Sequence, residues 1–125
     1  MIFISPLSVP VGKKNFSLNL NIYRNAHHRT LSQAKINYKS LMSSQLQPRQ
    51  KLDKISITYT LYPKIKRKMD ISNVCSVTDK FFSDCLVEMG WLVDDNYLFL
   101  DRVVYVFGEV DKHNPRVEIE VIECK

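Results

Sequence analysis

The strongest structural constraint in this sequence is the amphipathic segment of residues 73–89. Apolar side chains recur there at helical spacing, and Gly90 follows directly. A glycine in this place is typical of a helix C-terminus, where the chain turns into the left-handed conformation. We expect a helix with Asn73 or Ser72 as its N-cap and an end near Met89. Its expected core face comprises Val74, Thr78, Phe81, Phe82, Cys85, Leu86 and Met89.

The opposite face of this predicted helix carries polar side chains. At about 100° per residue, Asn73, Lys80 and Asp84 fall in one sector, which they share with Val77. Asp79 lies between the two faces. A lysine and an aspartate four residues apart also form ordinary surface ion pairs, so this pair alone does not indicate a functional site.

Alternating segments on either side of the helix predict β-strands. Residues 52–63 alternate apolar with polar side chains, and residues 116–124 alternate valine and isoleucine with glutamate. Residues 102–110 form a further β-rich run. We expect this run to pair with the last strand as an antiparallel hairpin around the turn at 111–115.

The N-terminal part is less regular. Residues 1–9 predict an opening strand at a sheet edge, because prolines interrupt it. Residues 11–30 are polar and rich in asparagine and cations, and we expect a long loop there. A first helix is expected over residues 32–46, capped by Thr30 or Ser32. The complete order predicts an α+β domain with a small mixed sheet and two helices on one face.

Composition narrows the class of protein. The 125 residues are the size of a single domain, 1–125, and the formal charge of +5 permits a polyanionic partner without requiring one. The three cysteines lack zinc-ligand spacing, and we expect reduced thiols in an intracellular protein. No apolar run reaches the about 18 residues that a membrane span needs. Near the start, basic residues follow the apolar ones, the reverse of a signal peptide, so we expect a cytoplasmic protein without a membrane partner.

Charged residues gather around the predicted helix. Four cations lie before it in residues 64–68, followed by the isolated Asp70, and the pair Asp94 and Asp95 comes after it. Carboxylates at such junctions, with a lysine between them, are what a magnesium-dependent phosphodiesterase needs, because Mg²⁺ takes oxygen ligands and substrate phosphate. The mixture of Arg, Lys, Asn and Tyr within residues 11–30 suits phosphate contact, although a solvated loop has the same composition.

Three stretches, RKMDISN, DKFFSD and EMGWLVDDN, are successive parts of one longer pattern. Together they resemble the RusA-type Holliday junction resolvases, whose core pattern is a basic run, Asp-x-Asp-Asn, a lysine, an aspartate four residues beyond it and an Asp-Asp pair after a glycine. Counted forward from Asp70, the chain matches the pattern as far as Asn73, and counted backward from Asp95 it matches as far as Lys80. The two alignments differ by four residues, about one helical turn, inserted between Asn73 and Lys80. YRNAHHRTLSQAKINY and the closing RVEIEVIE resemble the family's polar loop and final hairpin. Ser72 stands where the family has its second aspartate, and Asp79 is an alternative carboxylate.

The resemblance implies a homodimeric, Mg²⁺-dependent endonuclease that resolves four-way DNA junctions, or other branched DNA, by paired nicks in recombination and repair. Two other interpretations stay open: a branched-DNA-binding relative without cleavage, and a dimeric interaction module whose basic patch is only solvated. The expected catalytic residues are Asp70, Asn73, Lys80, Asp84 and Asp95, and the expected metal ligands are Asp70, Asp94 and Asp95. The expected DNA-binding residues are Arg24, Arg29, Lys64, Lys66, Arg67 and Lys68.

The expected ligands start far apart. A helix over residues 73–89 is about 25 Å long, so Asp70 and Asp95 leave its opposite ends. They can meet only if the loop after Gly90 folds back, or if a partner subunit supplies one of them. We therefore hypothesise sites shared across a homodimer, in which an isologous antiparallel contact brings unlike ends together.

Overall fold

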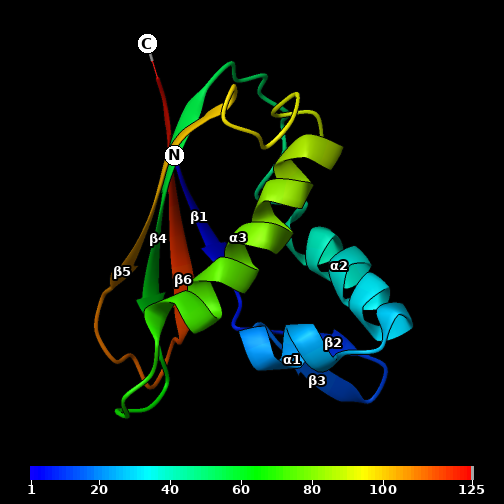
Figure 1. Ribbon diagram of the computed structural model, residues 1–125, viewed down its shortest axis with the longest axis vertical. Helices are drawn as coiled ribbons and strands as arrows, with labels where there is room; N and C mark the ends of the chain where they lie inside the picture. Colours follow the sequence, from blue (N-terminus) through cyan, green and yellow to red (C-terminus); the bar gives the residue numbers. More distant parts are fainter. Residues whose placement is uncertain (125) are drawn as a thin grey trace.

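A four-stranded mixed sheet forms the centre of the computed structural model, which describes residues 1–124 (Figure 1). The strands are β1 (Ile2–Ser5), β4 (Ile55–Tyr62), β5 (Leu100–Phe107) and β6 (Arg116–Glu123), in the order β1-β6-β4-β5. β6 is antiparallel to both β1 and β4, whereas β4 and β5 are parallel. The α+β class, the mixed sheet and the edge position of the first strand confirm the sequence-based predictions.

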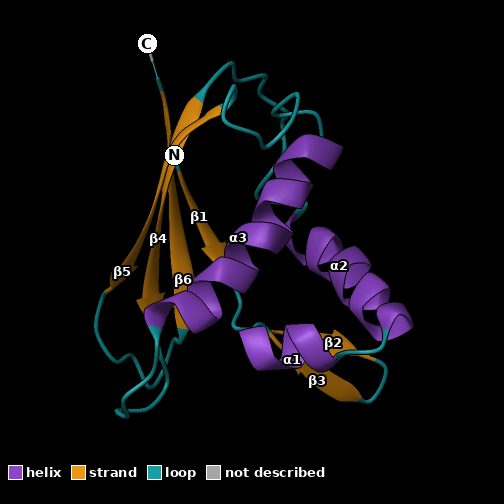
Figure 2. Ribbon diagram, in the orientation of Figure 1, coloured by secondary structure: helices purple, strands orange, loops and turns teal. Residues whose placement is uncertain are grey.

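All helices and a small hairpin lie on one side of this sheet (Figures 1 and 2). α3 (Ile71–Glu88) packs on β4 and β5, and α2 (His28–Met42) lies beyond it. The hairpin of β2 (Ser8–Val11) and β3 (Lys14–Ser17) and the short helix α1 (Leu20–Asn25) occupy the lower part of Figure 1. Within residues 1–124, no element covers the other face of the sheet.

Aromatic side chains join the sheet to the helices. Phe3 of β1 contacts Phe82 and Trp91, with ring centroids 5.4 and 5.7 Å apart. Phe81, on the side of α3 that faces away from the sheet, meets Tyr38 of α2 edge-on at 5.4 Å. Each such pair contributes about 0.5–1.5 kcal/mol beyond its area burial. α3 is therefore held on two sides, by the sheet and by the helices beyond it.

The predicted hairpin between the last two strands is wrong. β4 lies between β5 and β6, and α3 is the crossover that returns the chain to a strand parallel to β4. The connection after β5 then passes the end of β4, where the Gly108 N–H donates to the Leu61 carbonyl at 2.9 Å and the Asp111 N–H to the Pro63 carbonyl at 2.8 Å. β6 therefore enters the sheet on the far side of β4.

The predicted long loop over residues 11–30 is also wrong. Gly12, with φ of +62°, starts a two-residue turn that joins β2 to β3, and a positive φ at this position is typical of a type II′ hairpin. Val9 and Phe16 are buried and hold the hairpin on the core. Asn19 then caps α1 by accepting two backbone N–H groups. The predicted strand over residues 1–9 is divided between β1 and β2.

The first predicted helix forms earlier in the chain than expected. α2 begins at His28 because the His27 ring accepts the Arg29 N–H at 3.2 Å and caps the helix, a role expected for Thr30 or Ser32. α2 also ends earlier, and turns follow it.

The second predicted helix is confirmed, with a shifted start. Asp70 is the N-cap of α3, so Ser72 and Asn73 lie inside the first turn instead of capping it. Gly90 has φ of +80°, as expected after a helix. Val77, assigned to the polar sector, is fully buried, because that side of α3 packs against α1 and α2.

The structure bears on two expectations from composition, one about the cysteines and one about membrane-spanning segments. All three cysteines are free thiols; Cys75 and Cys85 are buried and Cys124 is half-buried. No helix within residues 1–124 is long and apolar enough to cross a membrane.

Candidate functional site

Residues 64–68, here called the basic loop, connect β4 to α3 at the carboxyl end of β4. Its four cations, Lys64, Lys66, Arg67 and Lys68, are all exposed. None of them makes an ion pair within residues 1–124. Because no neighbouring carboxylate neutralises them, their charge is available to a polyanion such as the DNA backbone.

Asp70 follows the basic loop and is exposed at the N-terminus of α3. Its backbone carbonyl accepts the Asn73 N–H at 3.0 Å, but its carboxylate makes no capping hydrogen bond. The positive end of the helix dipole favours a carboxylate here. The structure thus brings the basic loop, Asp70 and the half-buried Asn73 together at one end of α3.

Asp94 and Asp95, here called the acid loop, lie at the opposite end of α3. The preceding Trp91 N–H donates to the Leu86 carbonyl at 2.8 Å, and the chain after the acid loop is bonded to the start of β4 at 2.9 Å. The loop after the helix therefore does not fold back toward Asp70. With 18 residues, α3 separates the two ends by about 27 Å.

The acid loop concentrates negative charge. Asp94 accepts the Asp95 N–H through Oδ1 at 2.8 Å and the Asn96 side-chain amide through Oδ2 at 3.1 Å. Partial burial raises the pKa of Asp95, and the hydrogen bond with Asp94 and the negative charges of Asp94 and Asp84 raise this pKa further. A carboxylate whose charged form is disfavoured in this way gains from a bound cation.

Lys80 and Asp84 lie on the side of α3 that faces α1 and α2. The Lys80 ammonium lies 5.8 Å from the centre of the Tyr23 ring of α1, and Asp84 pairs with Lys35 of α2 at 3.7 Å. Along the helix axis Lys80 is about 15 Å from Asp70 and about 6 Å from Asp84. Within one protomer, Asp70 and Lys80 are therefore not brought together.

The two remaining predicted DNA-binding residues, Arg24 and Arg29, are exposed at the end of α1 and the start of α2. In Figure 1 the connection from β4 to α3 lies at the lower left, whereas the end of α1 and the start of α2 lie toward the lower right. The structure therefore does not bring these two arginines beside the basic loop.

No three His, Cys, Asp or Glu side chains within residues 1–124 converge so that they could hold a metal ion. Asp70 lies at one end of α3, and Asp94 and Asp95 lie at the other. A single protomer therefore does not assemble the predicted Mg²⁺ ligands.

Asp79, the alternative carboxylate, has a structural environment that the sequence did not reveal. It accepts hydrogen bonds from Tyr59 of β4 at 2.8 Å, from Ser83 at 2.9 Å and from Tyr105 of β5 at 3.0 Å. Ser83 at i+4 was a visible signal, but the two tyrosines become neighbours only through the parallel pairing of β4 with β5. Asp79 therefore connects α3 to the sheet.

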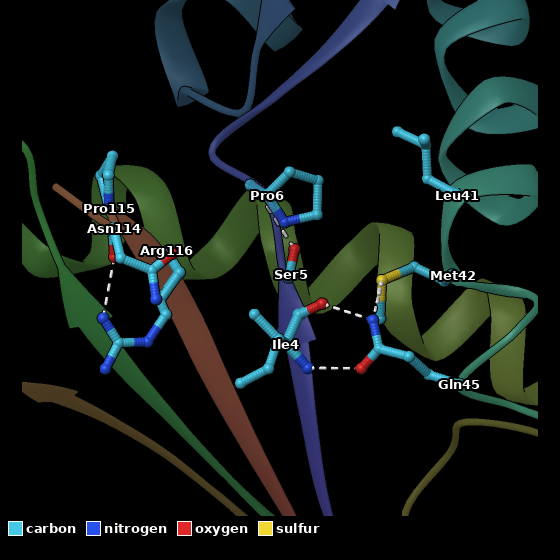
Figure 3. A pocket seen from close by; sticks show the side chains of 9 residues that line it. All are labelled: Ile4, Ser5, Pro6, Leu41, Met42, Gln45, Asn114, Pro115 and Arg116. Atoms are coloured by element: carbon cyan, nitrogen blue, oxygen red, sulfur yellow. Dashed lines mark hydrogen bonds between the residues drawn. The ribbon is translucent and has the colours of Figure 1, made fainter.

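A hollow of about 360 Å³ lies between β1, the end of α2 and the start of β6, and it contains none of the predicted site residues (Figure 3). On one side, the Gln45 side chain bonds the backbone of Ile4. On the other, Arg116 pairs with Asp111 at 2.8 Å and with Glu118 at 2.7 Å. This arginine is engaged within the fold and is not free for a phosphate.

Comparison of the chain with models of known protein families and with curated protein sequences gives no match. The resemblance to RusA-type resolvases therefore remains a prediction from the motifs between residues 67 and 96.

Proposed function

We propose that this chain is a Mg²⁺-dependent, structure-selective endonuclease that acts on branched DNA such as four-way junctions. The observation that supports this best is the position of Asp70, an exposed carboxylate without a capping bond that directly follows the unpaired basic loop. Both lie beyond the carboxyl end of β4, which is parallel to β5. In open α/β sheets, ligands bind outside the carboxyl ends of parallel strands.

The proposal requires two protomers, because α3 separates Asp70 from the acid loop. If a two-fold axis sets the two α3 helices antiparallel, Asp70 of one protomer approaches the acid loop of its partner. Three carboxylates then provide the oxygen ligands that Mg²⁺ prefers. When bound, the ion would activate water and neutralise charge on the scissile phosphate.

The remaining residues have roles that fit their positions. The basic loop holds the phosphodiester backbone beside Asp70, and Arg24 and Arg29 contact phosphates farther along the DNA. Asn73 orients a ligand or water beside Asp70. Lys80 stabilises negative charge on the bound strand, and Asp84 adds its charge to that of the acid loop.

Mixing two inactive variants tests the shared site. Asp70→Asn and Asp95→Asn should each abolish Mg²⁺-dependent cleavage of a synthetic four-way junction, and mixed dimers should regain one intact site. Glu120→Gln, which neutralises an exposed acid of β6 away from the basic loop, the acid loop and β5, is the matched control and should cleave normally. Mixtures that are no more active than either variant would rule out the shared site. A wild-type protein that never cleaves the junction would rule out the proposed nuclease activity.

A second candidate is a protein that binds branched DNA without cutting it. Two observations favour it: Ser72 replaces the family's second aspartate, and no three ligands converge within residues 1–124. Neutralising Lys66, Arg67 and Lys68 should then weaken binding to every DNA shape and lower the salt slope by about 0.9 per cation. Binding that does not change with salt would instead favour an interaction module with a solvated basic loop.

A further inference from the structure

The two edges of the sheet differ. The β1 edge has four residues and is capped by Gln45, which accepts the Ile4 N–H at 2.7 Å and donates to the Ile4 carbonyl at 2.8 Å (Figure 3). The β5 edge has eight residues and, within residues 1–124, pairs only with β4. An uncovered edge offers unpaired backbone donors and acceptors to another strand, and native proteins usually protect such edges.

The outward-facing groups of β5 follow from its pairing with β4. The Gly108 N–H donates to Leu61, so beyond the register shift that precedes Arg102 the even-numbered residues of β5 direct their N–H and C=O groups toward β4. Val103, Tyr105 and Phe107 direct theirs away from the sheet. Within residues 1–124, no strand pairs with these groups.

The acid loop lies beside the start of β5, and the basic loop, of opposite charge, lies beside its end, because the segment after β5 is bonded to Pro63 at the end of β4. Arg102 near the start is also exposed, and Glu109 and Asp111 follow the end, where Asp111 pairs with Arg116. Each end also exposes apolar side chains, and Tyr97 near the start is 80% exposed. They are Val93, Tyr97 and Leu98 at the start and Ile65, Phe107 and Val110 at the end.

We propose that the β5 edge binds the β5 edge of a second copy of this chain in antiparallel register, so that two four-stranded sheets form one continuous sheet. The two-fold axis then places the start of each β5 beside the end of the other. Each acid loop faces the partner's basic loop, and the exposed apolar groups meet. A parallel arrangement would instead place acid beside acid and base beside base.

The same pairing deepens the proposed function and, in this respect, rests on it. Eight strand residues span about 26 Å, close to the length of α3, which packs beside β5. The antiparallel copy therefore brings its acid loop toward Asp70 of the first protomer. The availability of the β5 edge itself depends only on the sheet.

Two variants of β5 test the interface. Val103→Pro removes an outward N–H and places the proline ring on the docking edge without breaking a bond to β4. Val106→Lys adds a charge beside the same edge. Ile2→Pro is the matched control, since the Ile2 N–H also points outward, but on the β1 edge.

Analytical ultracentrifugation should show a dimeric wild type and Ile2→Pro, and an at least tenfold weaker dimer for Val103→Pro and Val106→Lys. Circular dichroism checks that each variant is folded, and Val106→Lys keeps the test valid if the proline variant unfolds. A monomeric wild type, or folded β5 variants that dimerise like the wild type, would overturn the inference.

Cleavage of a four-way junction separates this inference from the nuclease. If the β5 variants lose both the dimer and cleavage, the interface is supported as the one that completes the site. If the wild-type dimer depends on β5 but cuts no DNA, the interface stands and the nuclease proposal fails. Full cleavage by a monomeric Val106→Lys would overturn the role of the interface in the site.

Discussion

The Asp79 carboxylate should be the most sensitive polar group in the fold. Tyr59 and Ser83 donate to one of its oxygens and Tyr105 donates to the other, at 2.8, 2.9 and 3.0 Å. Burial, followed by the adjacent Asp79, raises the pKa of Tyr59, so its hydroxyl stays a donor at any pH at which the protein is studied. Tyr59 is also fully buried, so water cannot replace the lost acceptor.

The magnitude follows from the number of donors. A hydrogen bond to a charged group contributes about 1.5–3 kcal/mol, so Asp79→Ala, which leaves two tyrosine hydroxyls without their acceptor, should cost about 3–5 kcal/mol. Total stabilities of about 5–15 kcal/mol make this a large loss. Asp79→Asn keeps an oxygen of the same shape that can still accept from Tyr59 and Ser83, and should cost only about 1–2 kcal/mol.

Urea unfolding measures these differences through Trp91, the single tryptophan, which is buried and donates to the Leu46 carbonyl at 3.1 Å. Ser76→Ala is a control in the same helix, because the Ser76 hydroxyl is buried without a partner within residues 1–124 and its loss should not destabilise. A loss below about 0.5 kcal/mol for Asp79→Ala, or equal losses for Ala and Asn, would refute the reasoning.

Other changes have equally definite outcomes. Burial raises the pKa of Cys75 and Cys85 to about 12, so a thiol reagent at pH 8 should modify Cys124 first. Because these folded-state values exceed the ordinary 9.0, the free energy of unfolding should fall as pH rises from 9 to 12, and a constant urea midpoint would contradict this. Asp95→Asn should raise the melting temperature at pH 7: the raised pKa of Asp95 means that its contribution is favourable below about pH 4 and is lost as pH rises through the folded-state value. A lower melting temperature would show that the charge stabilises the loop. Ser72→Asp introduces an acid in the first turn of α3, at the position where RusA-type resolvases have their second aspartate, and the helix dipole favours it by about 0.3–1 kcal/mol. It should lower the Mg²⁺ concentration needed for half-maximal cleavage, and an unchanged requirement would separate this position from the metal.

Local pattern predicted the elements that depend on their own residues. The alternation in residues 52–63 and 116–124 gave β4 and β6, and Gly90 marked the end of α3. The pairing of β5 was not predictable in the same way, because alternation shows which side chains are buried and not which strand lies beside them. The hairpin of β2 and β3, over residues 8–17, was missed because its few buried side chains are scattered among polar ones.

The same distinction holds for the candidate site: contacts between residues close in sequence were predictable, and contacts between separate elements were not. The basic loop and Asp70 are neighbours in sequence, so their proximity in the fold was predictable. Lys80 and Asp84 share a helix face, as predicted. Their partners Tyr23 and Lys35 belong to α1 and α2, and the sequence of α3 does not show which elements pack against it. The separation of Asp70 from Asp95 follows from the length of the helix between them. The sequence alone therefore indicated that a second protomer could be needed to complete the site.

Relative to the RusA pattern, this chain would have one additional helical turn between Asn73 and Lys80, and such a turn bears on where a complete site can form. In a site built within one protomer, one added turn would move Asp70 and Asp95 about 5 Å further apart and would disrupt their geometry. In an isologous antiparallel pair, each end of α3 faces the unlike end of the partner helix, and this remains true for any helix length, because both helices lengthen equally about the two-fold axis. α3 is packed against the sheet on one side and against α1 and α2 on the other, so an added turn displaces one of its ends relative to both. The same turn that argues against a site within one protomer is therefore compatible with the proposed shared site.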